Sequence, residues 1–546
     1  MSLSIFQHYA VIITQSISKF RKVLWGVTSY HILDDHLINK DFFKSDEVNQ
    51  KVIDTLYSHI DHALFELQTI HQIISLDQEL NITQIHYLSL IIQWYESKLQ
   101  ILYHAIILEA HKSGMPITAQ DVIIHEQALC DLETKIYGPK ISDIYQEVHL
   151  LLDHMRWLVT QYQTSTHQYQ IDQEDYQFFV QQLQWWSDDY AHHYTSDKHN
   201  TLQIEKDFLT VIQIAQIFAI VIQQFGWQTI IISYQWSQIN YDAAWWILEI
   251  PIWCKTKELV AYLRANSLQW YYRIIIDPHS NSISTSLKSI KIPARYHTIS
   301  IKRVCELINH EIMTHLVRSY NHKKTLIIKP SNISEAEEGL AVLNEKLVTS
   351  HIDQLSESII DIHMIGTYLW EKLNDHEIYR YLSVYYLLNG EDKKKSQSLS
   401  KQRIARIKRF HSLTQHYSNR KDVWYSRWYQ DTLKYFQQHT NNIHSIVQDL
   451  YDAKLKIQEL DLGKELFVGC NHYQTWLINP LPLGTLIYEA YLGHILDITA
   501  IHRDPRYLIT GWGYVDVNTL EVVNHIVTLI RSYIDTHDTS NQLIKK

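Results

Sequence analysis

The chain has 546 residues, enough for two or three domains with a large core, and its formal net charge of −10 argues against general nucleic-acid binding. Hydrophobic residues make up 46% of the chain and charged residues 20%, and only 13 glycines and 9 prolines interrupt it, so long helices should dominate a globular fold. The four cysteines lie far apart without paired spacing, which excludes a disulfide framework and a cysteine zinc site and fits a reducing compartment.

Residues 1–200 are predicted to form an N-terminal helical region. Apolar residues recur every three or four positions, as in "HYLSLIIQWYESKLQILYHAIILEAH", and this period is typical of packed amphipathic helices. The opening "MSLSIFQHYAVIITQSISKF" has no basic start and no small-residue cleavage site, so it predicts an amphipathic helix rather than a signal peptide. A more apolar segment, "FLTVIQIAQIFAIVIQQFGW", carries four glutamines and therefore predicts a buried helix rather than a membrane span. We expect a soluble, cytoplasmic protein without a membrane partner.

Residues 201–300 are predicted to form a small mixed α/β sheet region. Short β-branched and aromatic runs stand between turn signals such as "DPHSNS", and they read "WQTIIISYQW", "WWILEIPIW", "WYYRIIID" and "SISTSLKSIKI". An edge strand of such a sheet can hold the backbone of an extended peptide by adding it to the sheet. We therefore take "SISTSLKSIKI" as the candidate for that edge strand.

Residues 301–546 are predicted to form a helical catalytic region that carries a zinc site. Its first helix contains "CELINHEIMTHLVRSYN", in which Glu311 follows His310 directly and His315 comes five positions after His310. In an α-helix, a spacing of four leaves two side chains about 40° apart around the axis, and a spacing of five about 140°. A π-bulge absorbs one extra residue and returns both histidines to one face, where they can meet one metal ion. The alternative is a pair of hydrogen-bonded core histidines.

A catalytic zinc site with two helix histidines needs a further protein ligand and keeps its fourth position for water. The acidic residues of "SEAEEGLAVLNE" open a second helical run, and either Glu338 or Glu337 can supply that ligand. Glu311 is then the general base that takes a proton from the zinc-bound water. Alternatively, these acids stand at a helix N-terminus because the helix macrodipole favours negative charge there.

Together, "HEIMTH", the Arg and Asn of "LVRSYN", and "EEGLA" resemble the microtubule-associated tyrosine carboxypeptidases and their bacterial relatives with a QEGLA motif. Further likeness lies in "IYGPKISDIYQEVHLLLD", "RKDVWYSRWYQD" and "ELFVGC". The resemblance implies a zinc-dependent carboxypeptidase whose metal ligands are His310, His315 and Glu338, because the family's constant glutamate is the one before glycine. Glu311 is implied as the base. The implied fold is predominantly α with a small β-sheet (α+β), with a zincin-like catalytic core and an N-terminal helical region.

Two positions depart from the family pattern. The zinc motif is typically H-E-I-G-T-H, so Met313 stands where relatives have glycine, and His322 follows Asn321 where glycine is also usual. A methionine beside the metal is expected to narrow the cleft or change specificity, although it removes no ligand.

An exopeptidase must bind the terminal carboxylate of its substrate, which arginine or lysine does best, and it must place a polar donor on the developing oxyanion. "RKDVWYSRWYQD" offers Lys421, Tyr425 and Arg427, the first two on one helix face, although an exposed helix surface explains the same residues. Arg318 lies three positions after His315, and it either contacts the substrate or is a buried structural partner for a carboxylate.

The sequence thus predicts a zinc-dependent metallocarboxypeptidase that hydrolyses the C-terminal residue, tyrosine or another aromatic, of a peptide or protein tail. Tubulin is a partner only if the source is eukaryotic, and the bias toward His, Ile and Gln suggests a bacterial source, which excludes it. Two alternatives remain: an inactive relative that acts as a binding scaffold, and a zinc endopeptidase.

Overall fold

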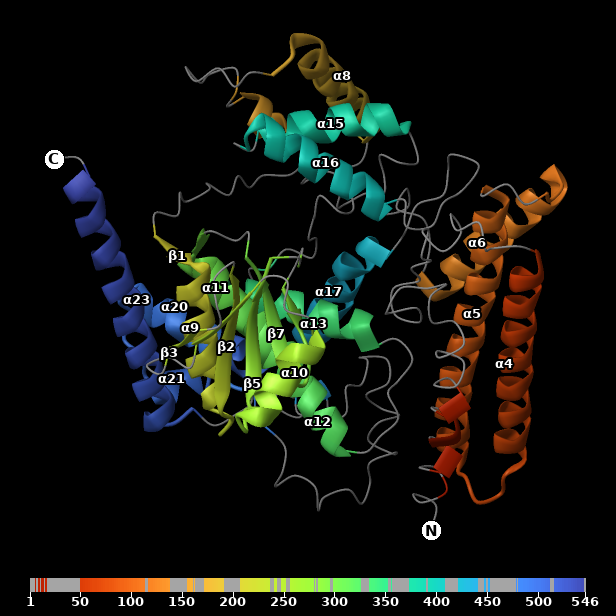
Figure 1. Ribbon diagram of the computed structural model, residues 1–546, viewed down its shortest axis with the longest axis horizontal. Helices are drawn as coiled ribbons and strands as arrows, with labels where there is room; N and C mark the ends of the chain where they lie inside the picture. The colour runs from red at the N-terminus through yellow and green to blue at the C-terminus, as the bar shows by residue number, and fades with distance from the viewer. Residues whose placement is uncertain are drawn as a thin grey trace. The chain divides into compact units, whose positions relative to one another are not determined.

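The computed structural model of the protein (Figure 1) describes residues 5, 8–9, 11–13, 15–16, 50–112, 116–137, 155–160, 162, 171–190, 207–235, 240–242, 247–251, 256–278, 280, 283–294, 298–325, 333–351, 355, 373–388, 391–407, 421–439, 446–447, 450–451, 478, 480–510 and 515–544. Helices dominate these residues, which confirms the predicted predominantly α fold with a small β-sheet. The chain divides into two compact units. The first comprises Met1–His199, Pro330–Glu335 and Ser356–Gln430, and the second comprises Asn200–Lys329, Ala336–Leu355 and Asp431–Lys546.

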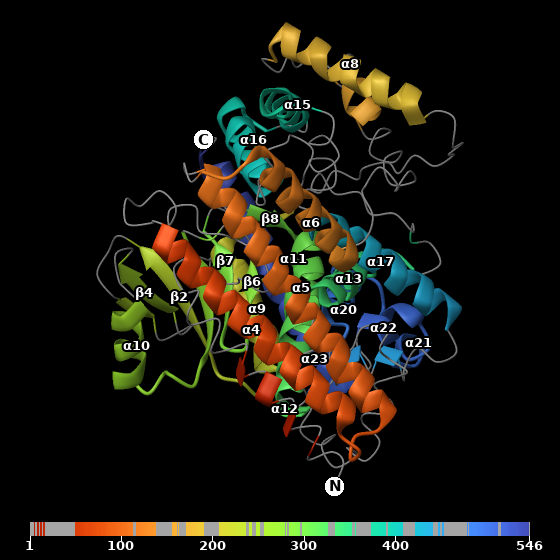
Figure 2. The ribbon, with the colours of Figure 1, turned by 90° about the vertical axis from the view of Figure 1, so that its right-hand side faces the viewer.

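The first unit is built from helices. They are α4 (Gln50–Leu76), α5 (Ile82–Lys112), α6 (Ala119–Tyr137), α8 (Gln173–Tyr190), α15 (Asp375–Leu388) and α16 (Lys393–Ile407). Figure 2 shows α4, α5 and α6 running alongside one another, and Ile101, Ala105 and Leu108 bury the face of α5 that meets α6. Phe179 of α8 stacks on Tyr381 of α15, with ring centroids 4.4 Å apart. Four of these helices, α4, α5, α6 and α8, lie within residues 1–200, where amphipathic helices were predicted.

The second unit contains a six-stranded sheet in the order β3-β4-β2-β5-β7-β6. Its strands are β2 (Thr229–Gln235), β3 (Asn240–Asp242), β4 (Ile247–Pro251), β5 (Tyr272–Asp277), β6 (Ser284–Thr285) and β7 (Ser289–Pro293). The four central strands are parallel, and β3 and β6 run antiparallel at the two edges. Continuous apolar runs such as "TIIIS" and "RIIID" form these central strands because both faces of a parallel sheet are covered.

Each face of the sheet has its own apolar layer. On one face, Ile274 and Ile276 of β5 pack in the main core with α9 (Val211–Gln223), the buried helix predicted from its apolar run. On the other face, Ile230, Ile232 and Ile275 pack with apolar residues of α10 (Thr256–Ala265). Among the described residues, no helix is both long and apolar enough to cross a membrane.

The segment "SISTSLKSIKI" forms the β6–β7 hairpin, and β6 is an edge of the sheet. A separate antiparallel pair joins β1 (Phe208–Thr210) to β8 (Thr298–Ser300), from which the histidine-bearing helix starts. Other helices with residues in the second unit include α11 (Ile301–Leu307), η2 (Ile308–Leu316), α12 (Val317–Thr325), α13 (Ile333–Lys346), α20 (Leu483–Tyr491), α21 (Ile498–Ile501), α22 (Pro505–Thr510) and α23 (Val517–Ile544).

Candidate metal centre

His310 and His315 lie on η2, a π-helix of nine residues between α11 and α12. The wide turn confirms the predicted bulge, and it brings the two Nε2 atoms to 3.0 Å from each other. The hydroxyl of Thr314 donates to the carbonyl of Asn309, five residues earlier, at 2.7 Å. The same turn keeps the apolar residues of the motif in the core, because Ile312 and Leu316 are fully buried.

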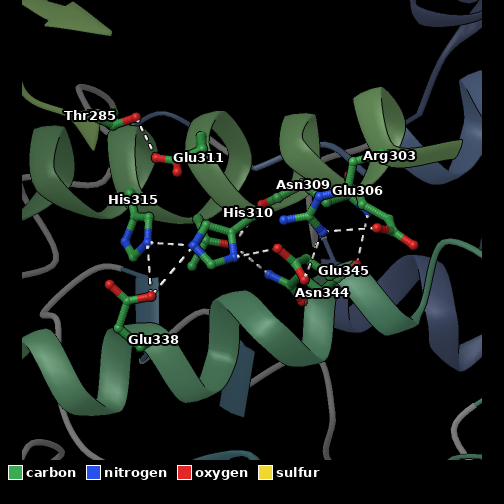
Figure 3. Close-up of polar contacts among 11 residues, drawn as sticks. Thr285, Arg303, Glu306, Asn309, His310, Glu311, His315, Glu338, Asn344 and Glu345 are labelled. Carbon is green, nitrogen blue, oxygen red and sulfur yellow. Dashed lines mark hydrogen bonds and ion pairs between the residues drawn. The ribbon is translucent and has the colours of Figure 1, made fainter. Parts of the chain in front are cut away.

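Glu338 of α13 completes a triangle of donor atoms. Its Oε2 lies 3.4 Å from His310 Nε2 and 3.5 Å from His315 Nε2 (Figure 3). Tetrahedral zinc with bonds of about 2.0–2.1 Å separates its ligands by about 3.3–3.4 Å, so the spacing fits one such ion. Among the described residues, these three form the group of His, Cys and carboxylate side chains that can hold a metal.

Each histidine also lies close to a carboxylate through its other ring nitrogen, Nδ1. His310 Nδ1 lies 2.9 Å from Glu345 Oε1, an electrostatic contact rather than a well-aligned hydrogen bond, and His315 Nδ1 lies 3.2 Å from Glu337 Oε1. Such partners fix the ring orientation and the tautomer that leaves Nε2 available to a metal. Glu337, the alternative ligand left open by the sequence, thus lies in this outer position.

The acids and imidazoles perturb one another strongly. Burial alone would lower the pKa of His315, but the charge of Glu338 and hydrogen bonds to Glu337 and Glu338 raise it to about 9. Burial likewise opposes the rise at His310, whose pKa is held well above its usual value mainly by Glu345. Burial would raise the pKa of Glu338, but the two histidines lower it to about 2. A metal ligand must present a free lone pair, so a bound cation replaces the histidine protons.

Glu311 has a different neighbourhood from the triangle. Its side chain is 7% exposed, and Oε2 accepts a hydrogen bond from the Thr285 hydroxyl of β6 at 2.6 Å. Figure 3 shows the carboxylate turned toward Thr285, while both imidazoles are directed toward Glu338. The negative charge of Glu311 also contributes to the raised pKa of His310. The base candidate is therefore a buried, hydrogen-bonded carboxylate adjacent in sequence to a ligand.

A buried polar network that the sequence reasoning missed supports the π-helix. Asn309 Nδ2 donates to Thr485 Oγ1 at 3.0 Å, and Asn309 Oδ1 accepts from the Gly484 amide at 2.9 Å. Asn344 Nδ2 donates to Thr314 Oγ1 at 2.7 Å and to the Tyr451 hydroxyl at 2.9 Å. The available signal was Asn309 in "CELINHEIM", a segment with the apolar spacing of a core helix, since buried polar groups need partners.

Gly484 lets α20 approach the motif helix closely. A Cβ atom at this position would lie 2.2 Å from the carbonyl oxygen of Cys305 and 2.6 Å from Asn309 Oδ1. The backbone carbonyl cannot move aside as a flexible side chain can, so only glycine fits this contact.

Arg318 and Met313 are both fully buried. Arg318 Nε donates to the Leu450 carbonyl at 3.0 Å, and burial lowers its pKa against the opposing charge of Glu337. This placement favours the structural role for Arg318 over substrate contact. Met313 packs in the main hydrophobic core, and its expected effect on the cleft or on specificity stays a prediction. The side chain of His322 lies outside the described residues.

The predicted substrate-binding residues Lys421, Tyr425 and Arg427 fall on α17 (Lys421–Gln438), so they share a helix as expected. Their side chains lie outside the described residues, and their roles stay predictions. The segment "ELFVGC" and most of "IYGPKISDIYQEVHLLLD" also lie outside the residues that the structure describes.

Residues 261–469 match the family model described as microtubule-associated tyrosine carboxypeptidase, which confirms the predicted resemblance. The matched range contains His310, Glu311, His315 and Glu338. No curated protein and no solved structure matches the chain.

Proposed function

We propose that this protein is a zinc-dependent metallocarboxypeptidase that removes the C-terminal residue of a peptide or protein. The observation that carries the proposal is the donor triangle of His310, His315 and Glu338, with sides of 3.0, 3.4 and 3.5 Å. A buried glutamate, Glu311, directly follows the first of these ligands in the sequence. These residues lie in the part of the chain that matches a family described as a carboxypeptidase.

The donor set favours zinc. Two imidazoles and one carboxylate are a common catalytic zinc set, and three protein ligands leave one position open. Zinc held by these residues would supply Lewis-acid chemistry, which polarises a scissile carbonyl and activates water. The carboxylates of Glu345 and Glu337 hold His310 and His315 with Nε2 directed to the metal position.

Glu311 is the proposed general base. It takes a proton from the attacking water and returns that proton to the leaving amine, which requires a carboxylate that is ionised in the resting enzyme. Its position directly after the ligand His310 gives it the place that the base has in related zinc motifs.

The edge strand β6 and helix α17 are the proposed substrate-binding elements. An edge strand offers free backbone groups, which can pair with an extended substrate as an added strand. Arg427 or Lys421 would bind the terminal carboxylate and Tyr425 would face the oxyanion, as the chemistry of an exopeptidase requires. Following the family description, the residue removed is proposed to be tyrosine or another aromatic.

The test uses two peptides that end in tyrosine and differ only in C-terminal amidation, incubated with the zinc-loaded protein and followed by mass spectrometry. The free acid should lose its tyrosine about ten- to a hundredfold faster, because amidation removes one charge-assisted hydrogen bond. Arg427→Ala or Lys421→Ala should narrow this difference.

Glu311→Gln serves as the chemical control, since it keeps the shape of the side chain and cannot accept a proton. It should retain zinc and lose at least about a hundredfold in hydrolysis. Equal cleavage of both peptides, or internal cuts, would indicate the alternative zinc endopeptidase. Zinc binding without any hydrolysis would indicate the alternative binding scaffold.

A further inference from the structure

The proposed base, Glu311, accepts a hydrogen bond from the hydroxyl of Thr285. Thr285 Oγ1 donates to Glu311 Oε2 at 2.6 Å, a length typical of a charge-assisted bond between a hydroxyl and a carboxylate. Among the described residues, no other hydrogen bond reaches the Glu311 carboxylate, so its second oxygen, Oε1, stays available.

The backbone around Thr285 is anchored independently of Glu311. Thr285 pairs with Ile290 in the β6–β7 hairpin, and the Ser286 amide donates to the Ser289 carbonyl at 2.8 Å to close the turn. From β5, the hydroxyl of the buried residue Tyr272 donates to the Ser286 carbonyl at 2.9 Å. The Thr285 hydroxyl is therefore presented from a fixed point on the sheet edge.

A glutamate side chain needs a fixed hydrogen-bond partner to hold its carboxylate in one orientation. The terminal torsion of a carboxylate is broad, so an unrestrained Glu311 would sample many orientations. Proton transfer requires one oxygen within hydrogen-bond reach of the water, in the correct direction. A hydrogen bond to the other oxygen defines both the rotamer and the oxygen that faces the reaction.

We propose that Thr285 is a positioning residue for catalysis: it holds Oε2 of Glu311, so that Oε1 faces the attacking water and takes its proton. This inference rests on the proposed peptidase function. It assigns to the edge strand a role beyond substrate pairing, because the same two-residue strand sets the orientation of the base.

The test compares Thr285→Val, which keeps the shape and removes the donor, with Thr285→Ser, which keeps the hydroxyl. Thr528→Val is the matched control, because it makes the same chemical change outside the site. Thr528 is an exposed residue of α23. For Thr285→Val, kcat should fall about ten- to a hundredfold, with KM, zinc content and thermal midpoint as in the wild type. Thr285→Ser should recover kcat to within about threefold of the wild type, because a hydroxyl is again present.

A double variant separates positioning from general damage. If Thr285 acts through Glu311, adding Thr285→Val to Glu311→Gln should cause no further loss, whereas independent effects would multiply. The inference is overturned if Thr285→Val keeps full kcat, if Thr285→Ser fails to rescue, if zinc or folding is lost, or if the losses multiply. Inactivity of the wild type, or full activity of Glu311→Gln, would instead refute the proposed function itself.

Discussion

Replacing Glu345 by glutamine should weaken zinc binding without removing a ligand. Glu345 Oε1 lies 2.9 Å from His310 Nδ1, on the side of the ring opposite the donor triangle. Neutralising such an outer carboxylate lowers the basicity of the ligand and loosens its ring, and this typically costs about 10- to 100-fold in metal affinity. The corresponding free energy is about 1.4–2.7 kcal/mol.

The chain offers a matched control for this change. Glu306 also pairs with Arg303, at 2.9 Å compared with 3.1 Å for Glu345, but it has no contact with His310 in the structure. Glu306→Gln therefore removes the same charge from the same arginine, and zinc affinity should change by less than about twofold.

The assay is competition for zinc against a chelator of known affinity, at fixed pH and ionic strength. The dissociation constant of Glu345→Gln should rise about 10- to 100-fold over that of the wild type. An unchanged constant for Glu345→Gln, or an equal rise for Glu306→Gln, would refute the assignment of Glu345 as the residue that orients His310.

Further predictions follow from the site and its support. Zinc binding at pH 7 should release protons, because the pKa of His315 is raised to about 9, the pKa of His310 is also well above its usual value, and both rings must be deprotonated to bind. The apparent zinc affinity should therefore climb as the pH rises from 7 through about 9. Calorimetric heats that are identical in buffers of different ionisation enthalpy would contradict this. Gly484→Ala should destabilise the protein by about 3 kcal/mol, because its Cβ would lie 2.2 Å from the Cys305 carbonyl oxygen. An unchanged midpoint in thermal unfolding would show that α20 can shift away.

Patterns within single segments of the sequence were sufficient to predict the histidine-bearing helix and the buried helix α9. The five-residue spacing of His310 and His315 predicted a π-turn, and η2 has that form. The apolar run after Phe208 predicted a buried helix, and α9 is buried in the main core. These features depend on periods within one segment, which the sequence displays directly.

Strand order and second partners depend on contacts between distant segments. β-branched runs indicated strands, but their parallel order arises from connections that periodicity does not encode. Thr285 reaches Glu311 only because of the hairpin register, and Asn309 meets Gly484 across 175 positions. Glu345 lies seven positions after Glu338, on the same helix face, so the sequence could have predicted it as a partner for the site.

Burial decides between alternatives that sequence leaves open. Arg318 could be read as a substrate contact or as a structural cation, and its complete burial favours the second role. Glu337 and Glu338 were equivalent candidates by residue type, but only the oxygen of Glu338 lies near both Nε2 atoms.

The most direct test of the zinc site is the metal content of three purified proteins measured by mass spectrometry. They are the wild type, His315→Ala, and His525→Ala as a control at an exposed position on α23. We expect about one zinc per chain in the wild type and in His525→Ala, and close to none in His315→Ala, because two remaining donors do not hold a catalytic zinc. Full zinc occupancy in His315→Ala would contradict the ligand set of His310, His315 and Glu338.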